Sequence, residues 1–267
     1  MTGAASGATG LAQEWLRDPR PRRRPRLRLV CFPHAGGSAR FYYPWLRELP
    51  TGIELLAVQY PGRDDRLDEP LLDRMDQLAD PLADAVAEVA DVPLVLFGHS
   101  MGASVAFEVA RRLDNRSSGL VRHLFVSARP APFSTAPALG PPRDDETLVR
   151  ELARLGGTDS ALFDDPEIRA TLLPAIRGDY RLIEGYRYRA GPPLSCATTA
   201  VVGSHDSEVP CRLAEGWQAA TTGTFALRVM QGGHFYLTER RSELVAYLLT
   251  ALGMRTAAHR GDPASTP

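Results

Sequence analysis

Short apolar runs alternate along the chain with segments whose apolar residues recur at helical spacing. Six runs rich in Val, Leu and Ile predict strands, at 27–32, 53–59, 92–97, 121–127, 198–203 and 225–230. Most of them are almost continuously apolar, which is typical of parallel strands covered on both faces. Strands separated by helical patterns predict a doubly wound, mostly parallel α/β sheet with helices on both faces.

Two helical patterns between the strands have an apolar face. Residues 71–90 and 102–113 carry apolar side chains at intervals of three and four. Pro81 interrupts the first pattern, and Asp80 before it could cap a second helix that begins at this proline. The spacing thus leaves open whether 71–90 holds one helix or two.

The alternation stops between residues 141 and 190, where only helical patterns occur, and it resumes after Pro193. A helical stretch inserted into a strand–helix series is interpreted as a lid over the sheet. The alternative is that these helices belong to the core layer.

The two ends of the chain differ from the middle in composition. Residues 1–26 are rich in Gly, Ala, Arg and Pro, and the tail 255–267 is also poor in large apolar residues. Such segments bury too little apolar surface to order themselves, so we expect a flexible arm, one domain over 27–254 and a flexible tail. The run "RPRRRPR" could contact an acidic partner, but a solvated arm is the better interpretation.

Composition describes an ordinary globular protein of 267 residues with a formal net charge of −1. This balance gives no overall field to attract nucleic acid or an anionic membrane. No apolar stretch reaches the roughly 18 residues typical of a membrane span, and the N-terminus lacks the apolar core of a signal peptide. Cys31, Cys196 and Cys211 show no CxxC spacing. A disulfide framework or metal site is therefore not expected. The cysteine pattern instead favours a protein of the reducing cytoplasm.

Ser100 lies at the centre of the motif Gly98-His99-Ser100-Met101-Gly102, between strand 92–97 and a helical pattern. In a G-x-S-x-G turn between a strand and a helix, the serine hydroxyl is exposed above the sheet as a nucleophile. The helix start adds backbone N–H groups and the positive end of its dipole. The alternative is a tight turn without catalysis.

A serine nucleophile needs a histidine base and an orienting carboxylate, in the chain order Ser, acid, His. His123 lies inside a strand and His259 lies in the tail, which leaves His205 and His234. His234 follows the last strand after a Gly-Gly turn, whereas His205 adjoins the candidate acid and is interpreted as a loop residue that could at most contact substrate.

The acid belongs to the loop "GSHDSEV" after strand 198–203. Because parallel strands end at the same edge of a sheet, Asp206 and His234 are expected beside Ser100. Glu208 is the reserve acid, although it could instead begin the next helix.

A second backbone donor for an oxyanion is expected in the Gly-rich loop after strand 27–32. "FPHAGGSA" predicts the N–H of Ala35 as this donor, together with the N–H of Met101. The alternative is a Gly-rich turn without ligand. The loop matches neither glycine pattern of nucleotide sites, so nucleotide binding is disfavoured.

Five motifs in order, "FPHAGGSA", "QYPGRDDR", "FGHSMGASVAFEVA", "LLPAIRGDY" and "GGHFYL", resemble the type II thioesterases of polyketide and nonribosomal peptide synthesis. Vertebrate medium-chain fatty-acyl thioesterases are relatives. The resemblance covers about residues 27–250. It implies an α/β-hydrolase fold with a helical lid, and hydrolysis of acyl groups from phosphopantetheinyl carrier proteins to remove aberrant or stalled units, with no metal or other cofactor.

Motif matching places Ser100, Asp206 and His234 at the catalytic triad and Ala35 and Met101 at the oxyanion hole. The acid loop departs slightly from the G-D-x-D pattern of many relatives, but its last aspartate still aligns. The resemblance also implies that apolar lid residues line the acyl channel, unless they only pack within the lid: Leu172, Leu173, Ile176, Tyr180 and Tyr186.

The expected partners are acyl carrier or peptidyl carrier protein domains, with no nucleic acid or membrane partner, and we expect a monomer. Because carrier proteins are commonly acidic, arginines near the lid or near the "PGRDDR" loop could bind them, although solubility alone could explain exposed arginines. Three alternatives remain: a general carboxylesterase or lipase on the same fold, a cyclising type I thioesterase domain, and a noncatalytic hydrolase-fold binding protein. The initial Met and the lack of a carrier-protein remnant favour a discrete protein over the type I domain.

Overall fold

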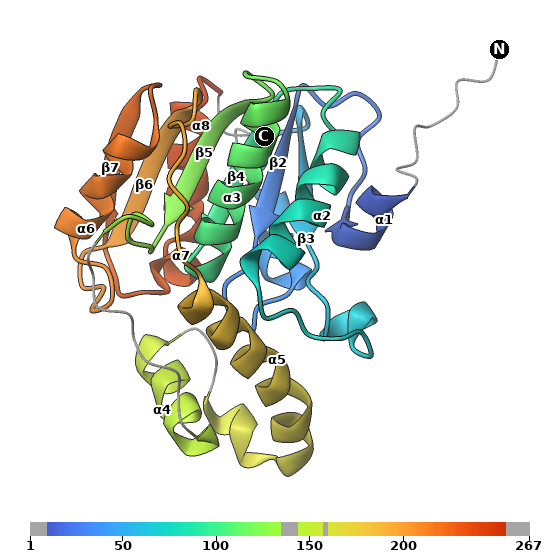
Figure 1. Cartoon of the computed structure of the whole chain (residues 1–267), viewed down its shortest axis with the longest axis vertical. Coiled ribbons are helices and arrows are strands. Elements are labelled where there is room, and N and C mark those ends of the chain that lie inside the picture. The colour runs from blue at the N-terminus through green and yellow to red at the C-terminus, as the bar shows by residue number, and fades with distance from the viewer. Residues whose placement is uncertain (1–9, 135–143, 157–159, 255–267) are drawn as a thin grey trace, which may run out of the picture.

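The computed structural model describes residues 10–134, 144–156 and 160–254. Its strands form one sheet with the order β1-β3-β2-β4-β5-β6-β7 (Figure 1). All neighbouring strands are parallel except β1, which runs antiparallel to β3. The six predicted strands are confirmed to within two residues. The strands are β1 Leu16–Arg17, β2 Leu27–Phe32, β3 Ile53–Val58, β4 Leu94–His99, β5 Val121–Ser127, β6 Ala197–Gly203 and β7 Phe225–Met230.

Helices cover both faces of this sheet. On one face lie α1 Leu11–Trp15, α2 Met75–Glu88, α3 Met101–Arg116, α6 Cys211–Glu215 and the 3-10 turn η4 Gly216–Ala220. On the other lie the 3-10 helix η1 Ala39–Arg47, α7 Tyr236–Glu239 and α8 Arg241–Ala251. Strand β4 shows why its sequence is continuously apolar: Leu94 and Leu96 enter one core cluster, whereas Val95 and Phe97 enter the other.

Residues 11–17 contradict the prediction of a flexible arm over 1–26. They form α1 and β1, in which Ala12 and Trp15 are buried and Leu16 pairs with Val58 at the edge of the sheet. The Arg66 guanidinium lies 4.3 Å from the centre of the Trp15 ring. The short run "LAQEWL" supplies enough apolar surface to pack on α2, which the composition of the whole segment concealed. Residues 1–9 and the predicted tail 255–267 lie outside the described residues.

Helix α2 is continuous from Met75 to Glu88, with Pro81 in its interior. The possible second helix that starts at this proline is therefore wrong. Proline removes one backbone hydrogen bond and crowds the preceding turn. The buried side chains of Leu78, Leu82 and Val86 hold the helix on the sheet across this defect.

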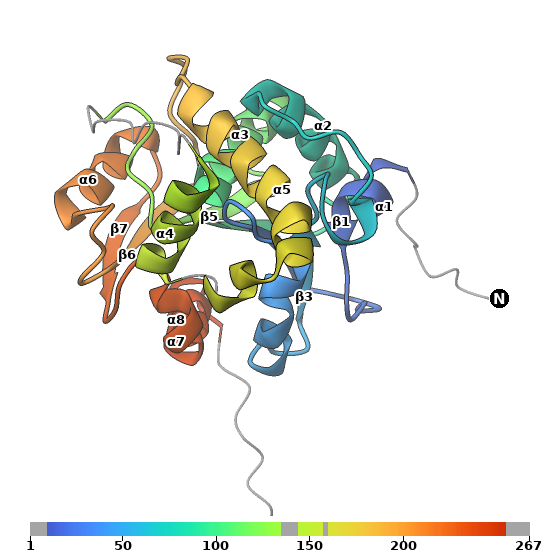
Figure 2. The same cartoon turned by 90° about the horizontal axis from the view of Figure 1, so that it is seen from below.

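The segment between β5 and β6 is helical, as predicted for 141–190. It comprises α4 Asp145–Leu155, the 3-10 turn η3 Ser160–Asp164 and α5 Pro166–Gly185. Asp144 and Asp165 cap the two α-helices by accepting hydrogen bonds from backbone N–H groups. Figure 1 shows α4 and α5 together at one end of the molecule, and Figure 2 shows that α5 crosses in front of the strands when this end is viewed. The part of the segment at 135–143 and 157–159 is outside the described residues.

These three helices have a small apolar cluster of their own, separate from the two clusters of the sheet. It consists of Leu148, Leu152, Phe163, Leu173 and Ile176. The described residues include no helix of the length and hydropathy needed to cross a membrane.

The packing of α1 generates a stability prediction. Trp15→Ala should lower the free energy of unfolding by about 3 kcal/mol, because a large buried ring is replaced by a cavity. Urea unfolding followed by circular dichroism measures this change. The exposed Arg24→Ala in the same segment is the control and should change it by less than about 0.5 kcal/mol. Equal unfolding free energies for the two variants would contradict this packing of α1 and would support the prediction of a flexible arm.

Candidate active site

Ser100 occupies a strained turn between β4 and α3. Its backbone is left-handed, with φ 54° and ψ −118°, and its N–H donates to the Ser127 carbonyl at 2.8 Å. Both flanking glycines are required. A Cβ on Gly98 would lie 2.2 Å from the Gly102 carbonyl oxygen, and a Cβ on Gly102 would lie 2.1 Å from the Phe32 carbonyl oxygen. The start of α3 therefore lies directly against the end of β2, as the nucleophile turn requires.

The loop after β2 faces this helix start, and its backbone donors are largely occupied. Gly36 N–H donates to Asp179 Oδ2 at 2.7 Å, and Gly37 N–H donates to the His34 carbonyl at 2.9 Å. Within the described residues, the N–H groups of Ala35 and Met101 have no acceptor. The two donors predicted from the sequence are thus free to bind a ligand oxygen.

Asp206 and His234 are in direct contact. His234 Nδ1 lies 2.9 Å from Asp206 Oδ2, and both residues are more than nine-tenths buried. Asp206 Oδ1 accepts the backbone N–H groups of Glu208 and Val209. Burial alone would raise the pKa of Asp206. The hydrogen bonds and charge of its partners outweigh burial and lower the pKa below the ordinary 3.8. The carboxylate is therefore ionised at neutral pH and can hold the imidazole in one orientation.

Backbone contacts hold the acid loop and the histidine loop together. Ser204 N–H donates to the Met230 carbonyl at 2.7 Å, and His205 N–H donates to the Gly232 carbonyl at 2.9 Å. The side chain of His205 is exposed and, among the described residues, forms a hydrogen bond only with the neighbouring Ser204, as expected of a loop residue. Glu208 pairs with Arg154 of α4 instead of with a histidine. Of the two candidate acids, Asp206 is the one in contact with His234.

The residue before Ser100 in the chain, His99, lies beside the pair of Asp206 and His234. The His99 ring lies 5.2 Å from the His234 ring between centres, and it precedes Ser100 in the turn. Among the described residues, the Ser100 hydroxyl makes no direct hydrogen bond to His234. Contacts between a serine and its base are often long without substrate and shorten in the reacting complex.

A cluster of buried rings around His234 was not predicted from the sequence. His34 packs edge-on against Phe41 and Phe235, and burial followed by the nearby charges of His234 and Arg63 lowers its pKa to about 3. Burial also lowers the pKa of His99 well below its ordinary value. Both rings are therefore neutral at physiological pH, so neither adds a positive charge beside His234. The motif positions of these histidines were visible in the sequence, but their burial was not.

A chain of hydrogen bonds fixes the His99 ring. His99 Nδ1 lies 2.8 Å from Ser127 Oγ, which lies 2.7 Å from the Tyr236 hydroxyl. Ser127 ends β5 and Tyr236 begins α7, so this chain joins the nucleophile turn to the helix that follows His234.

The five predicted channel residues separate into two groups. Leu173 and Ile176 belong to the apolar cluster of the inserted helices, against which Leu172 and Tyr180 pack. Ile176 also covers the loop after β2: its Cγ1 would lie 2.6 Å from a Cβ on Gly36. Tyr186 lies apart from this group, because its hydroxyl donates to Glu108 of α3 at 2.7 Å.

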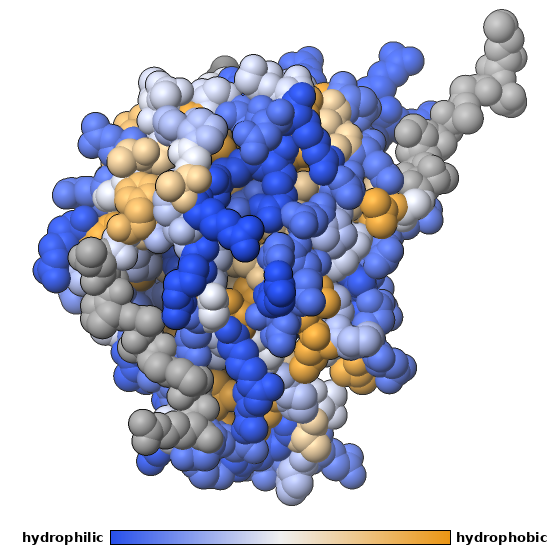
Figure 3. All heavy atoms as spheres, in the orientation of Figure 1, coloured by the Kyte–Doolittle hydropathy of each residue, from blue (hydrophilic) through white to orange (hydrophobic). Residues whose placement is uncertain are grey.

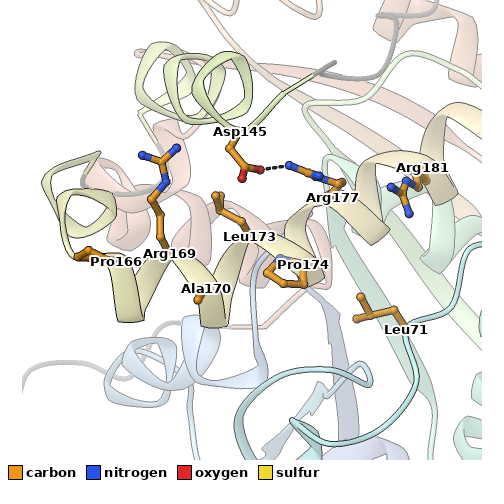
Figure 4. Close-up of a pocket in the computed structure, with 9 residues that line it drawn as sticks. All are labelled: Leu71, Asp145, Pro166, Arg169, Ala170, Leu173, Pro174, Arg177 and Arg181. Carbon is orange, nitrogen blue, oxygen red and sulfur yellow. Dashed lines mark ion pairs between the residues drawn. The ribbon is translucent and has the colours of Figure 1, made fainter.

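A groove of about 520 Å³ runs along the outer side of α5. Figure 4 shows Arg169, Arg177 and Arg181 along this helix and Leu71 opposite it, and Figure 3 shows apolar surface beside α5 on an otherwise mostly hydrophilic face. Arg169 pairs with Glu146 and Arg177 with Asp145 of α4. Arg181 is exposed and has no ion pair within the part of the chain that the structure describes.

The arginines of "PGRDDR" are not available to a partner. Arg63 and Arg66 are buried, at 6% and 4% exposure. Arg66 pairs with Glu14 and Glu69, and Arg63 pairs with Asp179 of α5. These two guanidinium groups therefore offer no exposed charge to a carrier protein. A charged motif in a loop predicts exposure, whereas Arg63 pairs with the buried carboxylate of Asp179 and Arg66 lies over the Trp15 ring.

Comparison with known proteins gives consistent matches. Residues 27–252 match the family described as Thioesterase domain. The chain is 41% identical over 251 residues to the probable cadicidin biosynthesis thioesterase of Streptomyces griseus, covering 94% of this chain and 69% of that protein. It is 40% identical over 231 residues to thioesterase PikA5 of Streptomyces venezuelae, covering 86% and 82%. The solved type II thioesterase BorB from the borrelidin biosynthetic cluster matches with a TM-score of 0.80 at 40% identity, covering 94% of this chain and 100% of that one. These matches confirm the predicted α/β-hydrolase fold.

The lowered pKa of Asp206 predicts a pH-dependent contribution to stability. The ionised carboxylate stabilises the folded chain above about pH 4, and this contribution is lost as the pH falls through the folded-state pKa below 3.8. The difference in unfolding free energy between wild type and Asp206→Asn should therefore be largest near neutral pH and shrink below pH 4. Denaturant unfolding at several pH values measures it. The exposed Asp73→Asn is the control, and the prediction fails when both differences vary alike with pH.

Proposed function

Because the chain belongs to the thioesterase family, we propose that it hydrolyses the thioester between an acyl group and the phosphopantetheine arm of a carrier protein. Ser100 is the proposed nucleophile, His234 the base and Asp206 the residue that orients the base. The observation that carries this assignment is the buried contact between His234 Nδ1 and Asp206 Oδ2, at the edge of the sheet where Ser100 follows β4.

In the proposed acylation step, Ser100 Oγ attacks the thioester carbonyl while His234 Nε2 accepts the hydroxyl proton. The hydrogen bond to Asp206 keeps the other ring nitrogen protonated and stabilises the imidazolium that forms. The oxyanion of the tetrahedral intermediate accepts hydrogen bonds from the backbone N–H groups of Met101 and Ala35. The carbon–sulfur bond then breaks, and the pantetheine thiol leaves with the proton from His234.

Deacylation repeats these roles with water. His234 takes a proton from a water molecule that attacks the acyl-Ser100 ester, and it then returns the proton to Ser100 Oγ as the acid departs. Every step uses these side chains, two backbone N–H groups and water, so no cofactor takes part. The neutral His34 and His99 favour this cycle because they do not compete electrostatically with a protonated His234.

The biological role we propose is the removal of aberrant or stalled acyl units from a biosynthetic assembly line. Its support is the identity of about 40% to thioesterases named for cadicidin and borrelidin biosynthesis. We further propose that Ile176 forms the wall of the acyl channel nearest the reacting carbonyl, because it lies on Gly36, next to the donor Ala35. Leu172, Leu173 and Tyr180 support that wall from within the inserted helices.

The proposed carrier-protein partner suits the groove beside α5. Carrier proteins are commonly acidic, and this groove combines apolar side chains with three arginines. Arg181 has no competing carboxylate among the described residues, so it is the arginine best able to bind an acidic partner.

Substrate preference tests the proposed function. The wild-type protein should hydrolyse an acyl-carrier protein with a kcat/KM at least about tenfold higher than the corresponding p-nitrophenyl ester, because docking adds binding energy that the ester lacks. Release of the free acid is measured for both substrates. Ser100→Ala should lower kcat for each by about 10⁴-fold or more.

Two outcomes would contradict this proposal. A strong preference for the oxygen ester would favour a general carboxylesterase or lipase. Activity of Ser100→Ala equal to that of wild type would leave a noncatalytic hydrolase-fold protein with a contaminating activity. Ser117→Ala, an exposed serine just after the same helix, is the matched control and should retain full activity.

Charge reversal tests the docking groove. Arg181→Glu should raise KM for an acyl-carrier protein about three- to tenfold at low salt and leave KM for an acyl-N-acetylcysteamine thioester unchanged. The effect should shrink as salt screens the charges. Arg23→Glu, an exposed arginine far from α5 in sequence, is the control. Equal KM shifts for both variants would point to net charge rather than to this groove.

A further inference from the structure

A buried ion pair joins α5 to the core beside the oxyanion loop. Arg63 Nη1 lies 2.7 Å from Asp179 Oδ2 and Arg63 Nη2 lies 2.8 Å from Asp179 Oδ1, which is a two-pronged geometry. Both side chains are 7% exposed. Burial alone would lower the pKa of Arg63, but the neighbouring carboxylate outweighs it, so the guanidinium stays charged.

The same two side chains hold the backbone of the oxyanion loop from both sides. Asp179 Oδ2 accepts the N–H of Gly36 at 2.7 Å, and Arg63 Nη1 donates to the carbonyl of Gly37 at 3.1 Å. Gly36 has a φ of 77°, and Gly37 closes the turn onto His34. Charged groups from other segments thus hold the Ala35–Gly36 and Gly37–Ser38 peptide groups.

Further hydrogen bonds fix Arg63 itself. Gln59 Nε2 donates to the Arg63 carbonyl at 3.1 Å, and Gln59 Oε1 accepts the N–H of Ala39 at 2.9 Å. The loops after β2 and β3 and helix α5 therefore meet in one connected polar network. An oxyanion donor must be in place before charge develops, and a rigid network provides such preorganisation.

We propose that Arg63 and Asp179 are positioning residues for catalysis: together they clamp the loop 35–37 so that the Ala35 N–H points at the developing oxyanion. This inference rests on the proposed function. The clamp also means that the inserted helix α5 must be seated for the oxyanion hole to be complete, since Asp179 belongs to α5.

Stability alone does not account for this pair. Taking two charges out of water costs several kcal/mol per ion, and well-packed apolar side chains commonly stabilise a core equally well. Apolar side chains cannot accept an N–H or donate to a carbonyl. The directional bonds to Gly36 and Gly37 are what the ion pair adds at this site.

Two double variants separate positioning from stability. R63M/D179L removes both charges without leaving one unpaired, so it should fold, but it supplies no hydrogen bond to the loop. R63Q/D179N also removes both charges, yet its amide groups can still accept from Gly36 and donate to Gly37. We expect kcat for an acyl-N-acetylcysteamine thioester to fall about 10- to 100-fold in R63M/D179L with KM changed less than about threefold, because the loss acts in the transition state. R63Q/D179N should regain most of this kcat.

A matched control comes from a second, largely buried pair on the sheet, Arg28 of β2 and Glu54 of β3. Glu54 accepts hydrogen bonds from Arg28 Nε at 2.6 Å and from the backbone N–H of Arg22 at 2.7 Å. Like Asp179, it therefore binds one guanidinium group and one backbone N–H, but away from the active-site edge of the sheet. R28M/E54L should keep the wild-type kcat, whatever its melting temperature. Thermal unfolding of all variants, with assays well below each midpoint, separates folding from catalysis.

The inference is overturned when folded R63M/D179L keeps kcat within about threefold of wild type, a change too small for a displaced oxyanion donor. It is also overturned when R28M/E54L loses kcat to the same extent, or when R63Q/D179N is no better than R63M/D179L. In each of these outcomes, thioester hydrolysis by the wild type would still support the proposed function. Absence of hydrolysis by the wild type would instead refute the proposed function itself.

Discussion

A close backbone approach at the start of α3 sets the geometry of the site. Helix α3 begins so near the end of β2 that a Cβ on Gly102 would overlap the Phe32 carbonyl, and a Cβ on Gly98 of β4 would overlap the Gly102 carbonyl. This approach places the N–H of Met101 opposite the loop that carries Ala35. It also forces Ser100 into a left-handed conformation, which a serine adopts only where surrounding contacts compensate for the strain. The hydrogen bond from Ser100 N–H to Ser127 is one such contact.

The ionisable groups around this turn include one ionised carboxylate and two neutral imidazoles. Asp206 is ionised and faces His234. The two other imidazoles nearby, His34 and His99, are held neutral by burial. If either carried a charge, it would oppose the protonation of His234, since like charges at ring-contact distance repel strongly in a poorly solvated site. The packing that buries His34 and His99 thus keeps both of them uncharged beside His234.

The sequence predicted what depends on local pattern and chain order. Apolar runs located the six main strands, and the order of Ser100, Asp206 and His234 predicted residues that the fold brings to one edge, where Asp206 contacts His234. Features that depend on distant contacts were not predictable. Pro81 leaves α2 unbroken because the sheet holds the helix on both sides of it. Arg63 was expected to be exposed because its partner Asp179 lies 116 positions away in α5. No local sequence pattern shows that these two residues come into contact.

The inserted helices are attached to the site at two points, and this constrains what they can do. Their apolar cluster is separate from the sheet, so their core can vary without disturbing the strands. Their polar tethers are not free to vary in the same way. Asp179 of α5 binds the loop that carries Ala35, whereas Arg154 of α4 binds Ser207 and Glu208 beside Asp206. One tether reaches the oxyanion side of the site and the other reaches the acid side. A movement of these helices that released either tether would loosen a loop of the site, so the seating of the inserted helices and the alignment of the site are physically coupled.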